Sequence, residues 1–182
     1  MHSILVVDDD ERQRKQIHWA LKDYYELFEA ANSSETLQIV SENPIDLVLL
    51  DLRLPPKEDN AEEGMKLLRE IKRVHSEILV MVISADGNKK TCLEAVRHGA
   101  YDYFTKPFDL EEMKVVLKRA LYMKSLEQEN DRLQRELENR YAFANLCVKG
   151  RKINHLEIGQ EQEELSIEQL FSQEKATPSP EV

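Results

Sequence analysis

Residues 45–56 read Ile45-Asp46-Leu47-Val48-Leu49-Leu50-Asp51-Leu52-Arg53-Leu54-Pro55-Pro56, and this stretch predicts the fold of the chain. Its apolar run ends in one carboxylate, Asp51, and two prolines follow soon after. A short apolar run between turn residues is typical of a strand buried on both faces of a parallel sheet. Open sheets of this kind place their ligand sites at the carboxyl ends of the strands. We therefore expect Asp51 to lie at the chemical centre of the protein.

Four more strand patterns alternate with helix patterns over residues 1–121. The other strands are expected at residues 4–7, 25–29, 78–83 and 101–105, and the helices at about 11–22, 33–43, 64–75, 89–98 and from 110 onward. Asn32 or Ser33 can cap the second helix, and Gly99 is a natural residue to end the fourth. This alternation predicts an α/β fold with a doubly wound, five-stranded parallel sheet.

The last helix has no stop signal near residue 121 and predicts an extended C-terminal helix. Five residues fit heptad positions a, d, a, d and a: Met123, Leu126, Asn130, Leu133 and Leu137. A lone Asn at an a position favours a parallel dimer in register. Residues 122–140 are therefore either a short parallel coiled coil or an amphipathic linker helix. Gly150 is expected to end the helix, and residues 141–182 to form an acidic, largely disordered tail with a short helix near 161–171.

Net charge, cysteine spacing and the length of apolar runs exclude several classes of protein. A net charge of −10 argues against direct binding of nucleic acid or of an anionic membrane, since both need basic patches. Cys92 and Cys147 show no metal-ligand spacing, and no signal-like N-terminus is present. No apolar run approaches the roughly 18 residues of a membrane span. These features predict a cytoplasmic protein.

Three strands end in residues that can do chemistry: Asp8 and Asp9, Asp51, and Ser84, while the fifth strand leads into Lys106. Carboxylates about 4 Å apart repel by about 4 kcal/mol per pair at an effective dielectric near 20, so the three require a cation. An all-oxygen site suits Mg²⁺. Asp51 is then placed to attack a phosphoryl group whose oxygens Lys106 and Ser84 stabilise. Each residue alone could be a helix cap, a turn residue or a surface charge; their convergence on one sheet edge favours the site.

Residues 1–121 resemble the receiver domain of two-component response regulators. The matching segments are residues 4–10 (ILVVDDD), 46–55 (DLVLLDLRLP), 82–85 (VISA) and 99–108 (GAYDYFTKPF). The resemblance implies a flavodoxin-like strand order of 2-1-3-4-5. It also implies that a sensor histidine kinase phosphorylates Asp51, and that enzymatic activity is limited to self-phosphorylation and autodephosphorylation. The Lys106-Pro107 bond is usually cis in this family.

The resemblance also assigns roles to the other site residues. Asp8 and Asp9 are expected to hold Mg²⁺ together with Asp51, and Lys106 to contact the phosphate. Ser84 and Tyr103 are expected to couple phosphorylation to a change at the face made by the fourth helix, the fifth strand and the fifth helix. Taken alone, Tyr103 at strand spacing is more often a simple core residue.

The chain departs from the family pattern in two ways. The loop before the third helix carries an acidic insertion, residues 56–63, which either shapes the active site or is a tolerated surface insertion. A similar loop and a continuing helix resemble NtrC-type, σ54-activating regulators, particularly those associated with PEP-CTERM systems. Residues after 140 contain neither a GxxxxGK[ST] phosphate loop nor a helix-turn-helix pattern.

Several outputs are compatible with such a receiver. The first hypothesis is a phosphorylation-dependent switch of homodimerisation or of binding to a downstream protein. The second is a receiver-only phosphate sink or relay intermediate, and a further alternative is a truncated form of a σ54-type transcriptional regulator. A permanently dimeric structural adaptor is disfavoured by the intact set of site residues.

Overall fold

Five parallel strands form one sheet in the order β2-β1-β3-β4-β5, which is the order that the resemblance implies. The computed structural model describes residues 1–56, 61–85 and 88–154, with side chains as far as Tyr141. The strands are β1 (Ser3–Val7), β2 (Glu26–Ala30), β3 (Leu47–Asp51), β4 (Leu79–Ser84) and β5 (Asp102–Thr105). The helices are α1 (Glu11–Leu21), α2 (Ser33–Glu42), α3 (Glu62–Val74), α4 (Lys89–Arg97) and α5 (Leu110–Asn154).

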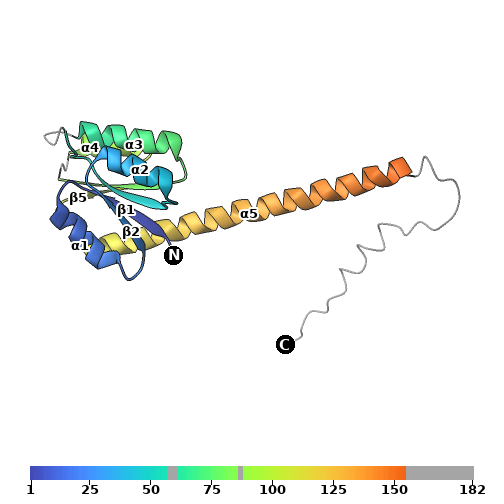
Figure 1. The fold of residues 1–182 in the computed structure, drawn as a ribbon, viewed down its shortest axis with the longest axis horizontal. Coiled ribbons are helices and arrows are strands. Elements are labelled where there is room, and N and C mark those ends of the chain that lie inside the picture. Colours follow the sequence, from blue (N-terminus) through green and yellow to red (C-terminus); the bar gives the residue numbers. More distant parts are fainter. Residues whose placement is uncertain (57–60, 86–87, 155–182) are drawn as a thin grey trace, which may run out of the picture. The chain divides into compact units, whose positions relative to one another are not determined.

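Helices cover both faces of the sheet, which explains why its central strands are apolar throughout (Figure 1). Val48 and Leu50 of β3 pack in a buried cluster with residues of α2, α3 and α4. Leu47 and Leu49 of the same strand belong to a second cluster, with residues of α1 and the first turns of α5. β3, the strand predicted from residues 45–56, therefore contributes to both hydrophobic cores.

Helix ends follow the capping residues in the sequence. The Asn32 side chain accepts a hydrogen bond from the backbone N–H of Glu35, which confirms Asn32 as the cap of α2. Gly99 has a φ of +93° and follows the last turn of α4, as expected for a glycine at a helix end. α3 begins at Glu62, two residues before the predicted Gly64. Acidic residues in a first turn are favourable there because they face the positive end of the helix dipole.

α5 spans 45 residues and passes through Gly150, so the prediction that this glycine ends the helix is wrong. A glycine in a helix costs only about 1 kcal/mol relative to alanine and keeps its backbone hydrogen bonds, so it weakens a helix without stopping it. The chain divides into two units, Met1–Glu129 and Asn130–Val182. Residues 141–154, the start of the predicted tail 141–182, belong to α5 instead. The rest of the predicted tail, residues 155–182, and residues 57–60 of the predicted insertion lie outside the described residues.

A polar cluster joins α5 to the amino-terminal edge of the sheet. The buried Lys124 donates from Nζ to the Asp46 carbonyl oxygen at 2.9 Å, and its Nζ lies 3.1 Å from Asp46 Oδ1. The other carboxylate oxygen of Asp46 accepts from the Ser3 N–H and lies 3.0 Å from His2 Nδ1. Burial opposes ionisation of Asp46, but these donors outweigh it and hold the pKa of Asp46 below its usual value.

We expect Asp46→Asn to lower the free energy of unfolding by about 1 kcal/mol at pH 7. A carboxyl whose folded pKa is lowered contributes stability above its unfolded pKa of 3.8, and this contribution is lost as the pH falls through the folded value. Urea unfolding of the unchanged chain and of Asp46→Asn, at pH 7 and at pH 3, measures this contribution. The difference in unfolding free energy between the two proteins should be smaller at pH 3 than at pH 7. The exposed Asp23 supplies a control, Asp23→Asn, with little effect at either pH. An undiminished difference at pH 3 would show that the Asp46 charge is not the cause.

Candidate functional site

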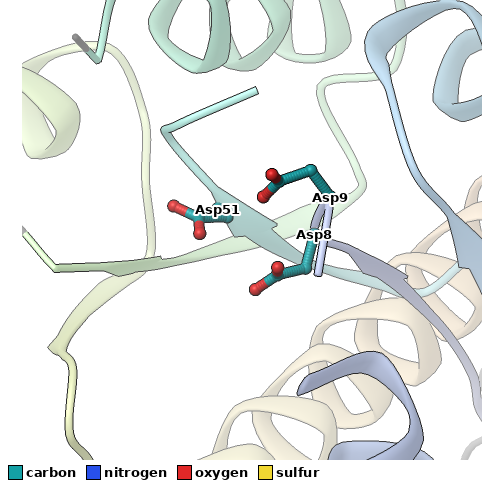
Figure 2. Close-up of side chains that lie close together, drawn as sticks. All are labelled: Asp8, Asp9 and Asp51. Atoms are coloured by element: carbon teal, nitrogen blue, oxygen red, sulfur yellow. The ribbon is translucent and has the colours of Figure 1, made fainter. Parts of the chain in front are cut away.

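Three carboxylates meet at the carboxyl edge of the sheet (Figure 2). β1 and β3 are neighbours, with Val7 opposite Leu50, so the residues that follow these two positions come together. Asp8 and Asp9 follow β1, and Asp51 is the last residue of β3. One oxygen from each of the three carboxylates lies within 4.8 Å of the others. The structure thus brings together the acidic residues that the sequence analysis grouped.

Backbone N–H groups orient two of these carboxylates. Asp8 Oδ1 accepts from the N–H of Asp10 at 2.9 Å, and Asp51 Oδ1 accepts from the N–H of Arg53 at 3.0 Å. Asp8 and Asp51 are buried, whereas Asp9 is exposed. The two buried carboxylates therefore have fixed directions, each with its second oxygen turned to another partner.

That partner is the ammonium of Lys106, which lies between them. Its Nζ donates to Asp8 Oδ2 at 2.7 Å and to Asp51 Oδ2 at 2.5 Å. The Lys106 N–H donates to the Ser84 carbonyl at 2.8 Å, and the Lys106-Pro107 bond is cis, as the resemblance implies. The backbone bond to Ser84 holds Lys106 directly after β5, with its side chain directed at the carboxylates.

The electrostatics of the site reflect burial as well as pairing. Burial raises the pKa of Asp8, Lys106 offsets part of this rise, and the neighbouring Asp51 carboxylate adds to it. Burial alone would lower the pKa of Lys106, but its bonds to Asp51 and Asp8 outweigh burial and raise it. The lysine is therefore held firmly in its charged form at neutral pH.

The three carboxylates fit a hard divalent cation. They offer only oxygen donors, and one ammonium compensates part of their negative charge. Mg²⁺ prefers oxygen ligands and keeps several waters, which the exposed position of Asp9 allows. The donor set, the excess negative charge and the open side of the cluster all suit Mg²⁺.

Ser84 and Tyr103 lie on neighbouring strands beside this cluster. Ser84 is the last residue of β4, one position after Ile83, which pairs with Asp51. Ser84 is fully buried, and Tyr103 is half-buried and packs against the cluster that contains α2, α3 and α4 residues. Tyr103 pairs with Val82, two residues before Ser84, so both side chains are on the same face of the sheet. Their role as a switch stays a prediction.

Two supporting side chains were missed by the sequence analysis. Asp10 caps α1 by accepting from the Arg12 N–H at 2.9 Å. Arg14, one turn into α1, reaches back and donates to the carbonyl oxygens of Asp8 and Asp9. An acidic residue before a helix is a recognisable cap signal, but an arginine in a helix carries no signal of this contact.

Comparison with known proteins identifies the family. The family model described as "Response regulator receiver domain" matches residues 4–118. This chain belongs to the response regulator receiver family. The acidic triad is typical of the Mg²⁺ site of such receivers, which are phosphorylatable, generally non-enzymatic signalling modules that partner with histidine kinases.

The most similar relatives include NtrX-like regulators. A putative NtrX-like response regulator of Rickettsia felis is 35% identical over 145 residues, 79% of this chain and 30% of that protein. A crystal structure of NtrX from Brucella abortus has a TM-score of 0.66 at 36% identity and covers 73% of this chain and 30% of that one. The chain thus spans 30% of the length of these relatives. They confirm the resemblance to NtrC-type receivers, whereas the association with PEP-CTERM systems stays a prediction.

A third relative has the length of a receiver alone. Sporulation initiation phosphotransferase F of Bacillus subtilis is 34% identical over 123 residues, which cover 67% of this chain and 95% of that protein.

In the part of the receiver chain that the structure describes, each helix is too short or too charged to cross a lipid bilayer.

Proposed function

We propose that Asp51 accepts a phosphoryl group from a sensor histidine kinase, with Mg²⁺ held by Asp8, Asp9 and Asp51. The observation that carries this proposal is the Lys106 ammonium, which bonds to both Asp8 and Asp51 while Asp9 leaves an open, acidic side. A bound Mg²⁺ would neutralise charge on the phosphoryl oxygens. Asp51 is the buried carboxylate at the end of the central strand, where a phosphodonor can reach the sheet edge.

One group that assists the proposed transfer, Lys106, already contacts Asp51. A carboxylate oxygen of Asp51 forms a bond to phosphorus while the N–P bond of the kinase phosphohistidine breaks, and the electron pair returns to the imidazole nitrogen. Lys106 is already 2.5 Å from Asp51, so its ammonium can donate to an oxygen of the transferred group. The Ser84 hydroxyl, at the end of the adjoining strand, is the proposed second donor.

Phosphorylation is proposed to change the face formed by α4, β5 and α5. The aspartyl phosphate would carry about −2 charges where the carboxylate carried one, and it would place three acceptor oxygens beside Ser84. Movement of Ser84 toward these oxygens would free space on the sheet face that it shares with Tyr103. Three large side chains on or beside α4 and β5 are already exposed: Leu93, Val96 and Tyr101. A shift between two populated conformations of this face would link the site to a partner.

A second copy of the chain is the proposed partner of α5. The apolar residues Met123, Leu126, Leu133 and Leu137 are 46–53% exposed along the helix, so no contact within the described residues buries them fully. We define these four residues with Asn130 as the α5 stripe. Its heptad spacing, with Asn at an a position, matches a parallel two-stranded coiled coil. This supports dimerisation as the output, with a downstream protein as a further partner.

Light scattering with and without beryllofluoride and Mg²⁺ tests this output. We expect the mass to rise from that of the 21.3 kDa monomer toward twice that value, because beryllofluoride on Asp51 mimics the phosphoryl group. Leu133→Gln, on the α5 stripe, should keep the chain monomeric with beryllofluoride. Arg135→Gln, at the opposite f position, should still dimerise like the unchanged chain. Asp51→Asn should not respond. A monomer in both states would remove dimerisation as the output.

A phosphate relay is the second candidate function. It is favoured by the similarity to a sporulation phosphotransferase over 95% of that protein's length. A chain that stays monomeric with beryllofluoride, yet loses its phosphate to a second protein, would support this role. A receiver from a longer σ54-type regulator stays an alternative, because the NtrX-like relatives are much longer than this chain.

A further inference from the structure

We propose that Arg14 is a positioning residue for the proposed Mg²⁺ site. The inference rests on the proposed function, since it concerns the backbone that carries Asp8 and Asp9. Arg14 belongs to α1, directly after the acidic residues, and its side chain is only 14% exposed. Its side chain does not extend into solvent but contacts the loop between β1 and α1.

The contacts of the guanidinium define its role. Arg14 Nη1 donates to the Asp8 carbonyl oxygen at 2.6 Å and to the Asp9 carbonyl oxygen at 3.2 Å. Its Nε lies 3.5 Å from Oε2 of Glu29 on β2, and the other oxygen of Glu29 lies 2.8 Å from His18 Nδ1. The guanidinium therefore connects the acidic loop to the neighbouring edge strand, and Glu29 helps to hold it there.

Asp9 is the ligand that depends most on this support. The Asp8 and Asp51 carboxylates each accept a backbone N–H and a bond from Lys106. Within the described residues, no hydrogen bond holds the Asp9 carboxylate, which is exposed. Its direction is set by the peptide planes on either side of its Cα, and Arg14 bonds the carbonyls of both peptides. Groups that orient metal ligands in this way commonly change metal affinity when removed.

Charge and positioning predict effects of opposite sign. The positive charge of Arg14 near the site opposes the binding of a divalent cation. If Arg14 acted through its charge alone, its removal would strengthen Mg²⁺ binding. If it acts by orienting the loop, its removal weakens Mg²⁺ binding despite the lost repulsion. The sign of the change therefore separates the two explanations.

Isothermal titration of Mg²⁺ into the full chain supplies the test. We expect Arg14→Met to bind Mg²⁺ about tenfold more weakly than the unchanged chain. Arg14→Lys keeps the charge and can reach one carbonyl, so its affinity should be intermediate. Arg12→Met removes the same charge from an exposed site two residues earlier and should bind at least as tightly as the unchanged chain. Equal or tighter binding by Arg14→Met would overturn the proposal.

Two further measurements extend the test, and the first does not depend on the folding of Arg14→Met. Glu29→Gln leaves the guanidinium in place but weakens its anchor, and should weaken Mg²⁺ binding by roughly threefold with little change in melting temperature. Hydrogen exchange without metal should be faster at the amide of Asp10, which donates to Asp8 Oδ1, in Arg14→Met than in Arg12→Met. Unchanged Mg²⁺ affinity in Glu29→Gln and unchanged exchange would contradict the role of Arg14. An unchanged chain that binds no Mg²⁺ would overturn the proposed metal site itself.

Discussion

Asp51→Asn is expected to abolish phosphorylation of the chain by a small phosphodonor such as acetyl phosphate in the presence of Mg²⁺. The amide lacks the anionic oxygen that forms the bond to phosphorus, and no second carboxylate has the same position at the end of β3. The fold of the site should survive, because the one Asn oxygen can still accept from the Arg53 N–H, although the bond from Lys106 to the second carboxylate oxygen is lost. Retained label, measured by mass spectrometry of the intact chain, should fall to background.

Matched variants separate loss of the nucleophile from loss of charge. Asp23→Asn, at an exposed position in the turn after α1, should be labelled like the unchanged chain. Asp9→Asn keeps Asp51 but removes one proposed metal ligand, so its labelling should recover partly at high Mg²⁺, and chelation of Mg²⁺ should stop labelling of every variant. Label on Asp51→Asn equal to that on the unchanged chain would show that another residue accepts the phosphoryl group.

Gly64→Ala is expected to lower the free energy of unfolding by about 3 kcal/mol. A Cβ at Gly64 would lie 2.3 Å from the Leu52 Cα and 2.6 Å from the Leu52 carbonyl oxygen, far inside contact distance. Both are backbone atoms, so the side chains cannot relieve the clash. The Gly64 N–H also donates to that carbonyl at 3.2 Å, and displacement of α3 would lengthen this bond.

A second glycine supplies the comparison. Gly99→Ala should cost only about 1 kcal/mol, because its φ of +93° is unfavourable for alanine but the nearest atom to a new Cβ is the flexible Lys72 Cε, at 3.2 Å. Urea unfolding of the two variants measures both costs. A Gly64→Ala chain no less stable than Gly99→Ala would mean that α3 can move away from β3. Because Leu52 directly follows Asp51, Gly64→Ala should also slow phosphorylation, whereas Gly99→Ala should not.

Local patterns predicted most of the fold. The apolar run before Asp51 and the similar run before Ser84 identified buried strands, because a strand covered on both faces needs apolar side chains at every position. Caps such as Asn32 act on N–H groups three residues away, so they too can be read locally. The prediction from local propensity was wrong at Gly150, because the favourable residues on either side keep the helix intact despite one unfavourable glycine.

The site was predictable as a set of residues but not as a geometry. Parallel strands bring their carboxyl ends to one edge, so the sequence alone groups Asp8, Asp9 and Asp51. Which oxygens face Lys106, and which carboxylate remains without a hydrogen bond within the described residues, depends on loop backbone directions. The resemblance to receivers supplied the expected roles of Ser84 and Tyr103, which apolar and polar patterns alone do not assign.

By itself, the sequence determined the parallel α/β sheet and its acidic edge, because periodicity, burial and strand ends are encoded in neighbouring residues. Only the tertiary structure decided that Lys124 meets Asp46, which lies 78 residues away. It likewise decided that Arg14 supports the acidic loop and that Gly64 touches the backbone beside Asp51. These contacts arise from the separation of packed backbones, a distance of a few ångströms that no local pattern of residues specifies.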